Sequence, residues 1–173
     1  MNKLSNLKWW QLALISVAVS FLGSLSGGKK RKSEKKVYEK ELEQAPWAPP
    51  AWVFAPVWTL NNYFLLQGLQ KLLLQKDLPQ QKKLLVMQVF IWLIFFSFNY
   101  VYFNRKSSIL ATIWTLADAA LAGTSFGISN KKNKKLSYNY LPLLAWTGYA
   151  STLAVYQALK NPDPVLHTPA VLQ

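Results

Sequence analysis

Rigid and aromatic side chains crowd into one short stretch, residues 45–64, which reads APWAPPAWVFAPVWTLNNYF. The stretch holds Trp47, Trp52 and Trp58 together with four prolines, and two asparagines follow in a run that is otherwise apolar. Trp58 and Asn62 are four residues apart, so a helix presents them on one face. An aromatic wall with a few polar groups is typical of a site that binds a small apolar molecule. The chemistry that these residues indicate is therefore binding.

Groups that could perform catalysis are sparse. Asp118 is the only acidic residue deep inside an apolar run, where an ionisable side chain commonly faces the protein interior and marks a functional position. A structural carboxyl beside a water-filled crevice is the alternative. A single carboxylate with no histidine or second acid nearby is poorly equipped for acid–base catalysis. His167 stands alone in a proline-rich tail and the chain has no cysteine, so the sequence predicts no metal site.

The composition places these residues in a membrane rather than in water. Of the 173 residues, 51% are hydrophobic and 14% aromatic, yet the formal net charge is +13. The two populations are separated along the chain, because the charges form clusters between long apolar stretches. Nucleic-acid binding would need the lysines on one folded face, whereas here they punctuate hydrophobic segments of bilayer length. The sequence thus predicts a lipid bilayer as partner and no nucleic acid.

Five segments are long and apolar enough to cross the hydrocarbon layer as helices, which takes about 20 residues each. None shows the sustained period-two alternation of a strand. We therefore expect an all-α integral membrane protein with a single domain, residues 1–173, built as a five-transmembrane-helix bundle. The spans are expected at about 7–27, 51–74, 84–103, 109–129 and 136–159, followed by a tail at 160–173.

The first segment and the orientation of the bundle each allow two interpretations. Lys3 and Lys8 before an apolar run that ends in SLSGG would also suit a secretory signal. The run is longer than a usual signal core, and the Trp9–Trp10 pair suits an interfacial anchor, so a retained helix is favoured. The two sides of the bundle carry ten basic residues each, so the excess of Lys and Arg that marks a cytoplasmic side gives no orientation.

Prolines shape the entry to the second segment. Pro49 and Pro50 end the preceding loop and set the angle at which the helix starts. Pro56 lies deeper, and we expect it to kink the helix and to open a cavity near the helix end. Anchoring at the membrane boundary explains Trp9 and Trp10, but for Trp58, beside a proline and amides, a pocket wall is favoured.

The motif around these residues resembles that of a known family. W47-A-P-P-A-W-V-F-A-P-V-W-T59 is similar to the W-x-P-P-x-x-V-F-x-x-V-W-T stretch of the translocator protein family. Bacterial members of that family are called tryptophan-rich sensory proteins (TspO), and animal members peripheral-type benzodiazepine receptors. Shorter matches follow in family order over nearly the whole chain, at L22-G-S-L-S-G27, Tyr38, A111-T112, L141-P-L-L-A-W146 and Asn161.

This resemblance implies a fold and a ligand class. It implies a five-helix bundle, usually a homodimer, in which the loop before the second helix folds as a lid over a pocket between the helices. Members of the family bind porphyrins, and many bind sterols or synthetic isoquinoline and benzodiazepine ligands. By the match, Trp58 and Trp146 correspond to the pocket tryptophans of helices two and five, and Ala150 to the small residue that lets a ligand or helix approach.

The third helix departs from the family pattern. Where the family has an asparagine and then a tryptophan, this chain has Phe95 and Phe98. Asn99 lies one turn after Phe95 on the same helix face, so it is placed to supply the missing amide at a different depth. We expect the pocket to be kept, with its polar groups relocated.

Charged and small residues outside the motif are expected to contact lipid or neighbouring helices. The basic block at 29–36 is expected to contact anionic headgroups, with a merely solvated lid as the alternative. Ala119, Gly123 and Gly127 form a ridge of small residues that permits close packing, either within the chain or against a second copy. The run 153–160 fits a loose pattern proposed for cholesterol, which often matches by chance.

We therefore predict a membrane receptor that binds a porphyrin or a similar flat apolar ligand, such as a sterol, without an obligatory cofactor. The alternatives are a porphyrin transporter, a protein that degrades bound porphyrin in light, and a membrane-embedded scaffold for another complex. No catalytic residue is assigned. The expected location is a bacterial cell membrane, which each chain crosses several times. Two chains are expected to form a homodimer. Basic residues of the lid are expected to contact the propionate groups of the ligand. The predicted ligand-binding residues are Tyr38, Trp47, Pro49, Pro50, Trp52, Trp58, Asn62, Phe95, Asn99, Asp118, Trp146 and Ala150.

Overall fold

The computed structural model describes residues 7–28, 31–75, 78 and 80–172. The described chain is helical, and its extended pairing is limited to an isolated bridge between Asp163 and Thr168. The helices are α1 (Trp9–Leu25), α2 (Arg31–Lys36), α3 (Phe54–Leu74), α4 (Gln81–Asn99), α5 (Ser108–Lys132), α6 (Lys134–Ser137) and α7 (Leu141–Lys160). A 3₁₀ turn (Ala51–Val53) leads into α3, and π-helical turns (Val37–Glu41 and Tyr100–Asn104) follow α2 and α4.

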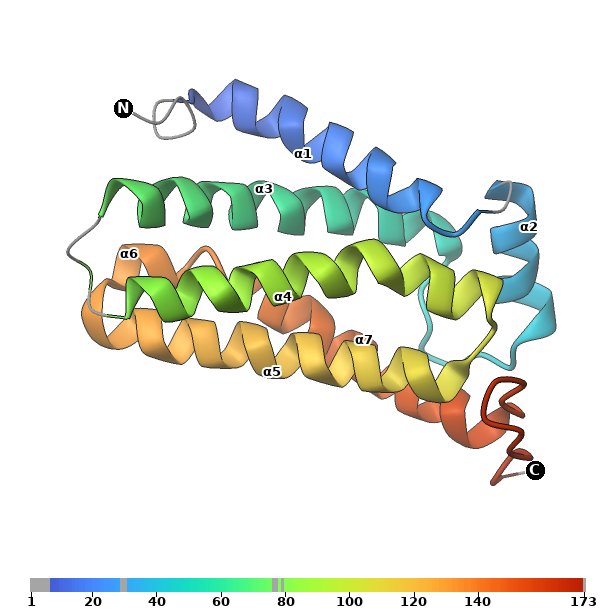
Figure 1. The fold of residues 1–173 in the computed structure, drawn as a ribbon. Helices are drawn as coiled ribbons and strands as arrows, with labels where there is room; N and C mark the ends of the chain where they lie inside the picture. The colour runs from blue at the N-terminus through green and yellow to red at the C-terminus, as the bar shows by residue number, and fades with distance from the viewer. Residues whose placement is uncertain (1–6, 29–30, 76–77, 79, 173) are drawn as a thin grey trace.

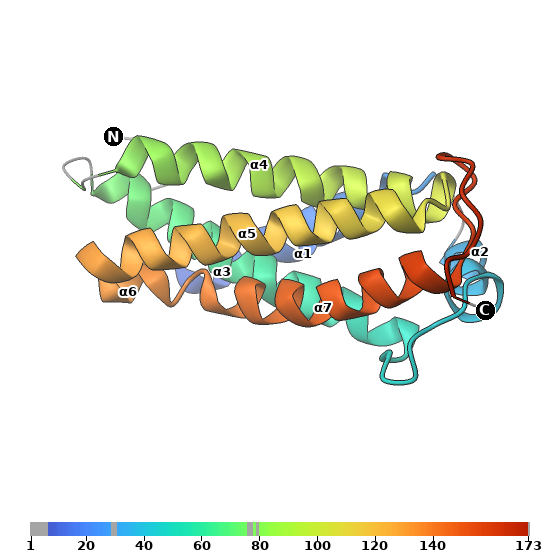
Figure 2. The same ribbon diagram turned by 90° about the horizontal axis from the view of Figure 1, so that it is seen from below.

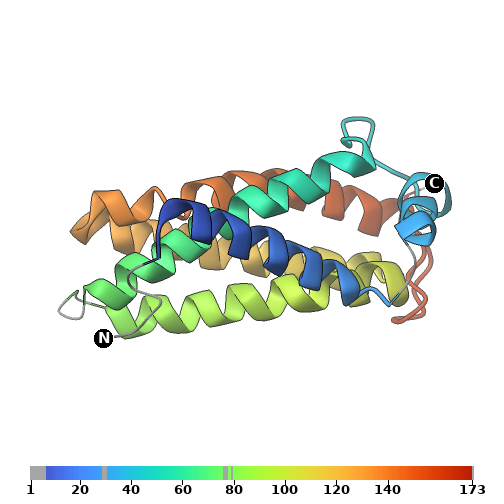
Figure 3. The ribbon, with the colours of Figure 1, turned by 90° about the horizontal axis from the view of Figure 1, so that it is seen from above.

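The long helices lie side by side along one axis and form an elongated bundle (Figure 1). Helix α5 packs most extensively on α7, and α1 packs on α3 at the edge of the bundle (Figures 2 and 3). One end of the bundle, which we call the α2 end, holds α2 and the C-terminal tail. The opposite end, the α6 end, holds α6, the start of α1 and the start of α4.

Helix α5 lines the interior with small and polar side chains. Its buried residues recur every three or four positions, as one face of a helix requires: Ser108, Ala111, Thr115, Asp118, Ala122, Ser125 and Ser129. Small side chains let neighbouring helices approach closely. Within the small-residue ridge, a Cβ on Gly123 would lie 3.5 Å from Leu144 of α7, whereas a Cβ on Gly127 would meet nothing within 4 Å. The ridge therefore serves packing within the chain at Gly123.

The fifth predicted span is not one helix. Instead of running continuously from 136 to 159, the chain forms α6, turns, and starts α7 at Leu141. Pro142 lies in the first turn of α7, where a missing N–H costs nothing, but it could not lie inside a helix that began at 136. The prediction of a continuous helix over this range is wrong for that reason.

Pro56 also has a different role from the one expected. Helix α3 begins at Phe54, so Pro56 is its third residue and lies in the first turn rather than deep in the helix. A proline at this position leaves few hydrogen bonds unmade. It therefore shapes the start of α3 together with Pro50 and the 3₁₀ turn.

Two helical segments of the described chain are by themselves long and apolar enough to cross a membrane, Gln81–Asn104 and Ser108–Lys132. Helix α1 is apolar but has 17 residues. Helix α3 buries two amides, Asn61 and Asn62, which lower its apolar character. Among the described helices, length and composition alone therefore single out α4, with the turn that extends it, and α5.

The C-terminal tail is joined to the start of α5 by a buried carboxylate. Asp163 Oδ2 accepts hydrogen bonds from Ser107 Oγ at 2.7 Å and from the N–H of Ile109 at 2.9 Å. Its Oδ1 accepts from the N–H groups of Val165 and Leu166, both at 3.0 Å. The charge also faces the positive end of the α5 dipole. Burial by itself raises the pKa of Asp163, but these four hydrogen bonds outweigh it and hold the pKa below its ordinary value.

Replacing Asp163 should therefore destabilise the protein in a pH-dependent way. We expect Asp163→Asn to cost about 1–3 kcal/mol, because an amide presents donors to N–H groups that need an acceptor. Since the folded pKa lies below the unfolded value of about 3.9, the stabilisation is complete above that value and is lost as the pH falls through the folded pKa. Thermal unfolding of wild type and variant in detergent at several pH values measures the stabilisation that the Asp163 carboxylate provides.

The difference in unfolding midpoint between wild type and variant should stay constant at neutral pH and shrink below about pH 4. Glu39→Gln is the matched control, because its carboxylate belongs to an exposed pair with Lys35 and should contribute little. A difference that does not change on acidification would contradict the role assigned to the Asp163 charge.

Candidate ligand-binding site

One face of α3 brings aromatic rings from three other elements together. Phe54 and Trp58 are four residues apart, hence on the same face. The Phe54 ring packs edge-on against Trp146 of α7 at 5.5 Å between ring centroids and against Tyr38 at 5.2 Å. The Trp58 ring lies 5.2 Å from Phe95 of α4. Together these five residues form what we call the aromatic cluster: Tyr38, Phe54, Trp58, Phe95 and Trp146.

The two tryptophans of the cluster are half-buried and contact different rings. Trp58 packs against the main hydrophobic core, and Trp146 contacts Tyr149 as well as Phe54. Phe54, which joins the two halves, was not among the predicted site residues. It lies in the same motif, four residues before Trp58, so helical spacing would have been enough to find it.

Residues 38–50 run over α7 and are attached to it by hydrogen bonds. Trp47 Nε1 donates to Thr152 Oγ1 at 3.1 Å, and Tyr149 Oη donates to the carbonyl of Trp47 at 2.7 Å. Asn161 bonds the backbone of Glu43 twice, accepting from its N–H at 2.7 Å and donating to its carbonyl at 3.1 Å. This segment therefore closes over the C-terminal half of α7.

Tyr38 connects the same segment to the aromatic cluster. Its side chain is buried, and its hydroxyl donates to the carbonyl of Pro49 at 2.8 Å. Burial, with smaller contributions from Tyr149 and Glu39, raises the pKa of Tyr38 to about 12. The phenol therefore keeps its proton, and the bond to Pro49, at any physiological pH.

The remaining residues predicted in the opening stretch lie toward the surface. Trp52 is 69% exposed, Trp47 is 50% exposed, and Pro50 is exposed. Ala150 is half-buried on α7, one turn after Trp146. Trp52 is thus largely open to the surroundings, whereas the Trp47 ring lies 5.5 Å from the Tyr156 ring, measured between ring centroids.

A buried amide, Asn62, and a half-buried one, Asn99, tie α1 to its neighbours. Asn62 Nδ2 donates to Ser20 Oγ at 2.9 Å, and Asn99 Nδ2 donates to the carbonyl of Gly23 at 3.1 Å. Asn99 therefore binds the backbone of α1, a contact that no local pattern predicts because the two residues are 76 positions apart. Asp118 is buried, and its Oδ1 has no hydrogen-bond partner among the described residues.

Phe95 fills the space next to α1. A Cβ built on Gly23 would lie 2.5 Å from Phe95 Cζ, which is closer than carbon atoms tolerate. The Phe95 ring also packs edge-on against Trp92 at 6.1 Å between centroids. Only a glycine at position 23 allows the ring to occupy this place.

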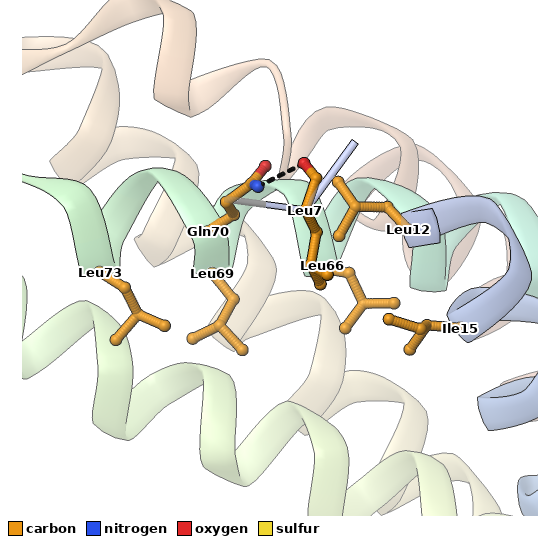
Figure 4. A pocket seen from close by; sticks show the side chains of 7 residues that line it. All are labelled: Leu7, Leu12, Ile15, Leu66, Leu69, Gln70 and Leu73. Atoms are coloured by element: carbon orange, nitrogen blue, oxygen red, sulfur yellow. Dashed lines mark hydrogen bonds between the residues drawn. The ribbon is translucent and has the colours of Figure 1, made fainter. Parts of the chain in front are cut away.

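Two hollows lie between α1 and α3, and no residue of the aromatic cluster lines either of them. The smaller, about 20 Å³, is lined by leucines with Ile15 and Gln70, whose Nε2 donates to the carbonyl of Leu7 at 2.8 Å (Figure 4). That volume is enough for about one water molecule. The larger, about 360 Å³, is an open groove lined by Ala13, Ser16, Val17, Pro56, Thr59, Leu60 and Tyr63. Neither cavity is lined by Trp58 or Trp146.

The sequence that builds this arrangement matches a known family. The model of the TspO/MBR family matches residues 12–159, which include the aromatic cluster. No curated protein matches the chain.

Replacing Gly23 should test whether the Phe95 ring fills the space next to α1. Alanine would normally favour a helix by up to about 1 kcal/mol over glycine. Here we expect Gly23→Ala to lower the unfolding midpoint, because the new methyl group meets the Phe95 ring. In a Phe95→Leu background the same change should be neutral or stabilising, and a double-mutant cycle on thermal unfolding measures the coupling. Additive effects would contradict the contact.

Proposed function

Because the chain belongs to the TspO/MBR family of membrane proteins, we propose that it is a multi-pass membrane receptor that binds a porphyrin or a similar flat apolar molecule. The observation that supports this most directly is the aromatic cluster, in which α3, α4, α7 and the turn after α2 each contribute rings. Flat aromatic molecules stack on such side chains.

The long helices α1, α3, α4, α5 and α7 are proposed to be the membrane spans, in a bacterial cell membrane. In hydrocarbon, helices satisfy their own backbone groups, and buried amides need partners inside the protein. Asn62 Nδ2 meets that need through its bond to Ser20, and Asn99 through its bond to Gly23. Asn61 Nδ2 and Asn62 Oδ1 have no hydrogen-bond partner among the described residues. The polar side chains that weaken the apolar character of α3 are thus placed in the interior.

Ligand would enter by parting the rings of the cluster. An aromatic pair is worth about 0.5–1.5 kcal/mol beyond its buried area, so separating Trp58 from Phe95 costs little compared with stacking both on a large flat ligand. Residues 38–50 would act as the lid. Lys35 and Lys36 near it pair with Glu39 and Glu41 at 3.8 and 3.7 Å, and such exposed pairs are weak enough for a ligand carboxylate to compete.

The two half-buried tryptophans should carry porphyrin binding. Titration of the protein in detergent with protoporphyrin, followed by quenching of tryptophan fluorescence, gives the affinity. We expect Trp58→Ala with Trp146→Ala to weaken binding by at least about tenfold, since each lost stacking contact is worth about 1 kcal/mol. Trp9→Ala with Trp10→Ala removes two exposed indoles and is the matched control. Equal affinity for both double variants would refute the assignment.

Weakening the attachment of the lid to α7 should speed the release of porphyrin while leaving the aromatic cluster itself unchanged. Thr152→Val removes the acceptor of the Trp47 indole, and Tyr149→Phe removes the donor to the Trp47 carbonyl. We expect the double variant to release porphyrin several-fold faster in stopped-flow experiments, because these two bonds hold the segment on α7. Thr124→Val is the control, since that hydroxyl donates only within α5, to Ala120. Unchanged dissociation would argue against a lid.

A further inference from the structure

The two ends of the bundle differ in how their charges are compensated. At the α2 end, lysines lie next to carboxylates, with nitrogen–oxygen distances from 2.6 to 3.8 Å. The ion pairs are Lys35–Glu39, Lys36–Glu41, Lys106–Glu41 and Lys160–Glu43. The predicted headgroup contact of the basic block at 29–36 falls partly on residues outside those that the structure describes.

The α6 end carries cations without acidic partners in the part of the chain that the structure describes. They come from several elements: Lys8, Lys71, Lys82, Lys83, Lys131, Lys132, Lys134 and Lys135. Asp77, the acidic residue of the sequence between α3 and α4, is outside the described residues. Lys71 donates to Asn139 Oδ1 at 2.7 Å, whereas the other seven lysines are exposed.

Exposed apolar and aromatic side chains lie next to several of these cations. On α4, Lys82 and Lys83 are followed directly by exposed apolar side chains at Val86, Val89 and Phe90. Trp9, 72% exposed, and Trp10 follow Lys8 at the same end, and aromatic rings of this kind mark membrane–water interfaces. Tyr138, beside α6, is 51% exposed.

Helix electrostatics do not account for all of these positions. Lys131 and Lys132 lie in the last turn of α5, where cations complement the helix dipole. Lys82 and Lys83, in contrast, lie in the first turn of α4, where the dipole opposes them. An external anion would relieve that repulsion.

We propose that the α6 end of the bundle binds anionic lipid headgroups. Lysines near a membrane surface attract acidic lipids. This end unites cations that have no acidic partner among the described residues, exposed aromatic rings and exposed apolar side chains of α4. Its cations lie at the ends of several helices, next to exposed apolar side chains. This arrangement suits a ring of lipid headgroups better than a single acidic macromolecule. The inference rests on the membrane location in the proposed function and not on the ligand site.

Lipid selectivity tests the proposal. Wild-type protein is reconstituted in phosphatidylcholine bilayers containing brominated phosphatidylglycerol, and quenching of tryptophan fluorescence gives the relative affinity for the anionic lipid. The α6-end variant carries Lys131→Gln, Lys132→Gln, Lys134→Gln and Lys135→Gln. The matched control at the α2 end carries Lys35→Gln, Lys36→Gln, Lys40→Gln and Lys106→Gln, with the same change in net charge.

We expect the α6-end variant to lose its preference for phosphatidylglycerol by about tenfold or more, given the strength of lysine–lipid attraction. The control should keep most of the preference, and raising the salt concentration should weaken it in wild type. Equal losses in both variants, or none in either, would overturn the proposal. The proposal would also be overturned if, in pure phosphatidylcholine, polyglutamate or an oligonucleotide bound to the same lysines more tightly than phosphatidylglycerol does.

Two further measurements keep the test independent of folding and of the ligand site. Protoporphyrin binding by the α6-end variant should equal that of wild type, because none of its lysines contacts the aromatic cluster. If the fourfold variant does not fold, Lys82→Gln with Lys83→Gln replaces it and should lower the lipid preference in the same direction.

Discussion

The position of two rings on one face of α3 is the constraint on which the candidate site depends. Phe54 and Trp58 are one helical turn apart, so whatever packs on one ring lies next to whatever packs on the other. Phe54 contacts Trp146 and Tyr38, and Trp58 contacts Phe95. Three helices and the turn after α2 are thereby positioned by a single helical repeat. Pro50 and Pro56 reinforce it, since they determine where α3 starts.

Several polar side chains inside the bundle connect helices. Asn62 and Asn99 both bind α1, through a serine hydroxyl and a backbone carbonyl, and Thr112 of α5 donates to the carbonyl of Ala154 in α7 at 2.8 Å. Such bonds are directional, whereas apolar packing between helices in lipid gains little from the hydrophobic effect. The amides therefore add specificity to the assembly, and α1, which lies at the edge, depends on them most.

Charged side chains have different partners at the two ends of the bundle. Near the C-terminal tail, carboxylates are used within the protein: Asp163 caps α5 and Glu41 pairs with Lys106 at 2.6 Å. At the opposite end the described lysines other than Lys71 are exposed, and none has an acidic partner among the described residues. A count of basic residues along the chain yields ten on each side and does not separate the two ends. The difference appears once the acidic residues are counted as well, because the loop between α1 and α3 and the tail hold Glu34, Glu39, Glu41, Glu43 and Asp163, whereas the loops of the other side hold Asp77.

The sequence by itself determined the helical class, the family and the central motif, because hydrophobic periodicity and the local spacing of Trp and Pro act within a few turns of one helix. Trp58 could be chosen on that basis, whereas Trp146 and Tyr38 were chosen from the resemblance to the family. Asn99 and Asn161 each bond to a residue that is distant in the sequence, and Gly23 and Phe95, which are in contact, are also distant from each other. No local pattern predicts such pairs. The turn between α6 and α7 and the exposed position of Trp52 were likewise decided by the tertiary structure. Local spacing determines which face a side chain occupies, but only the packing of whole helices determines what that face meets.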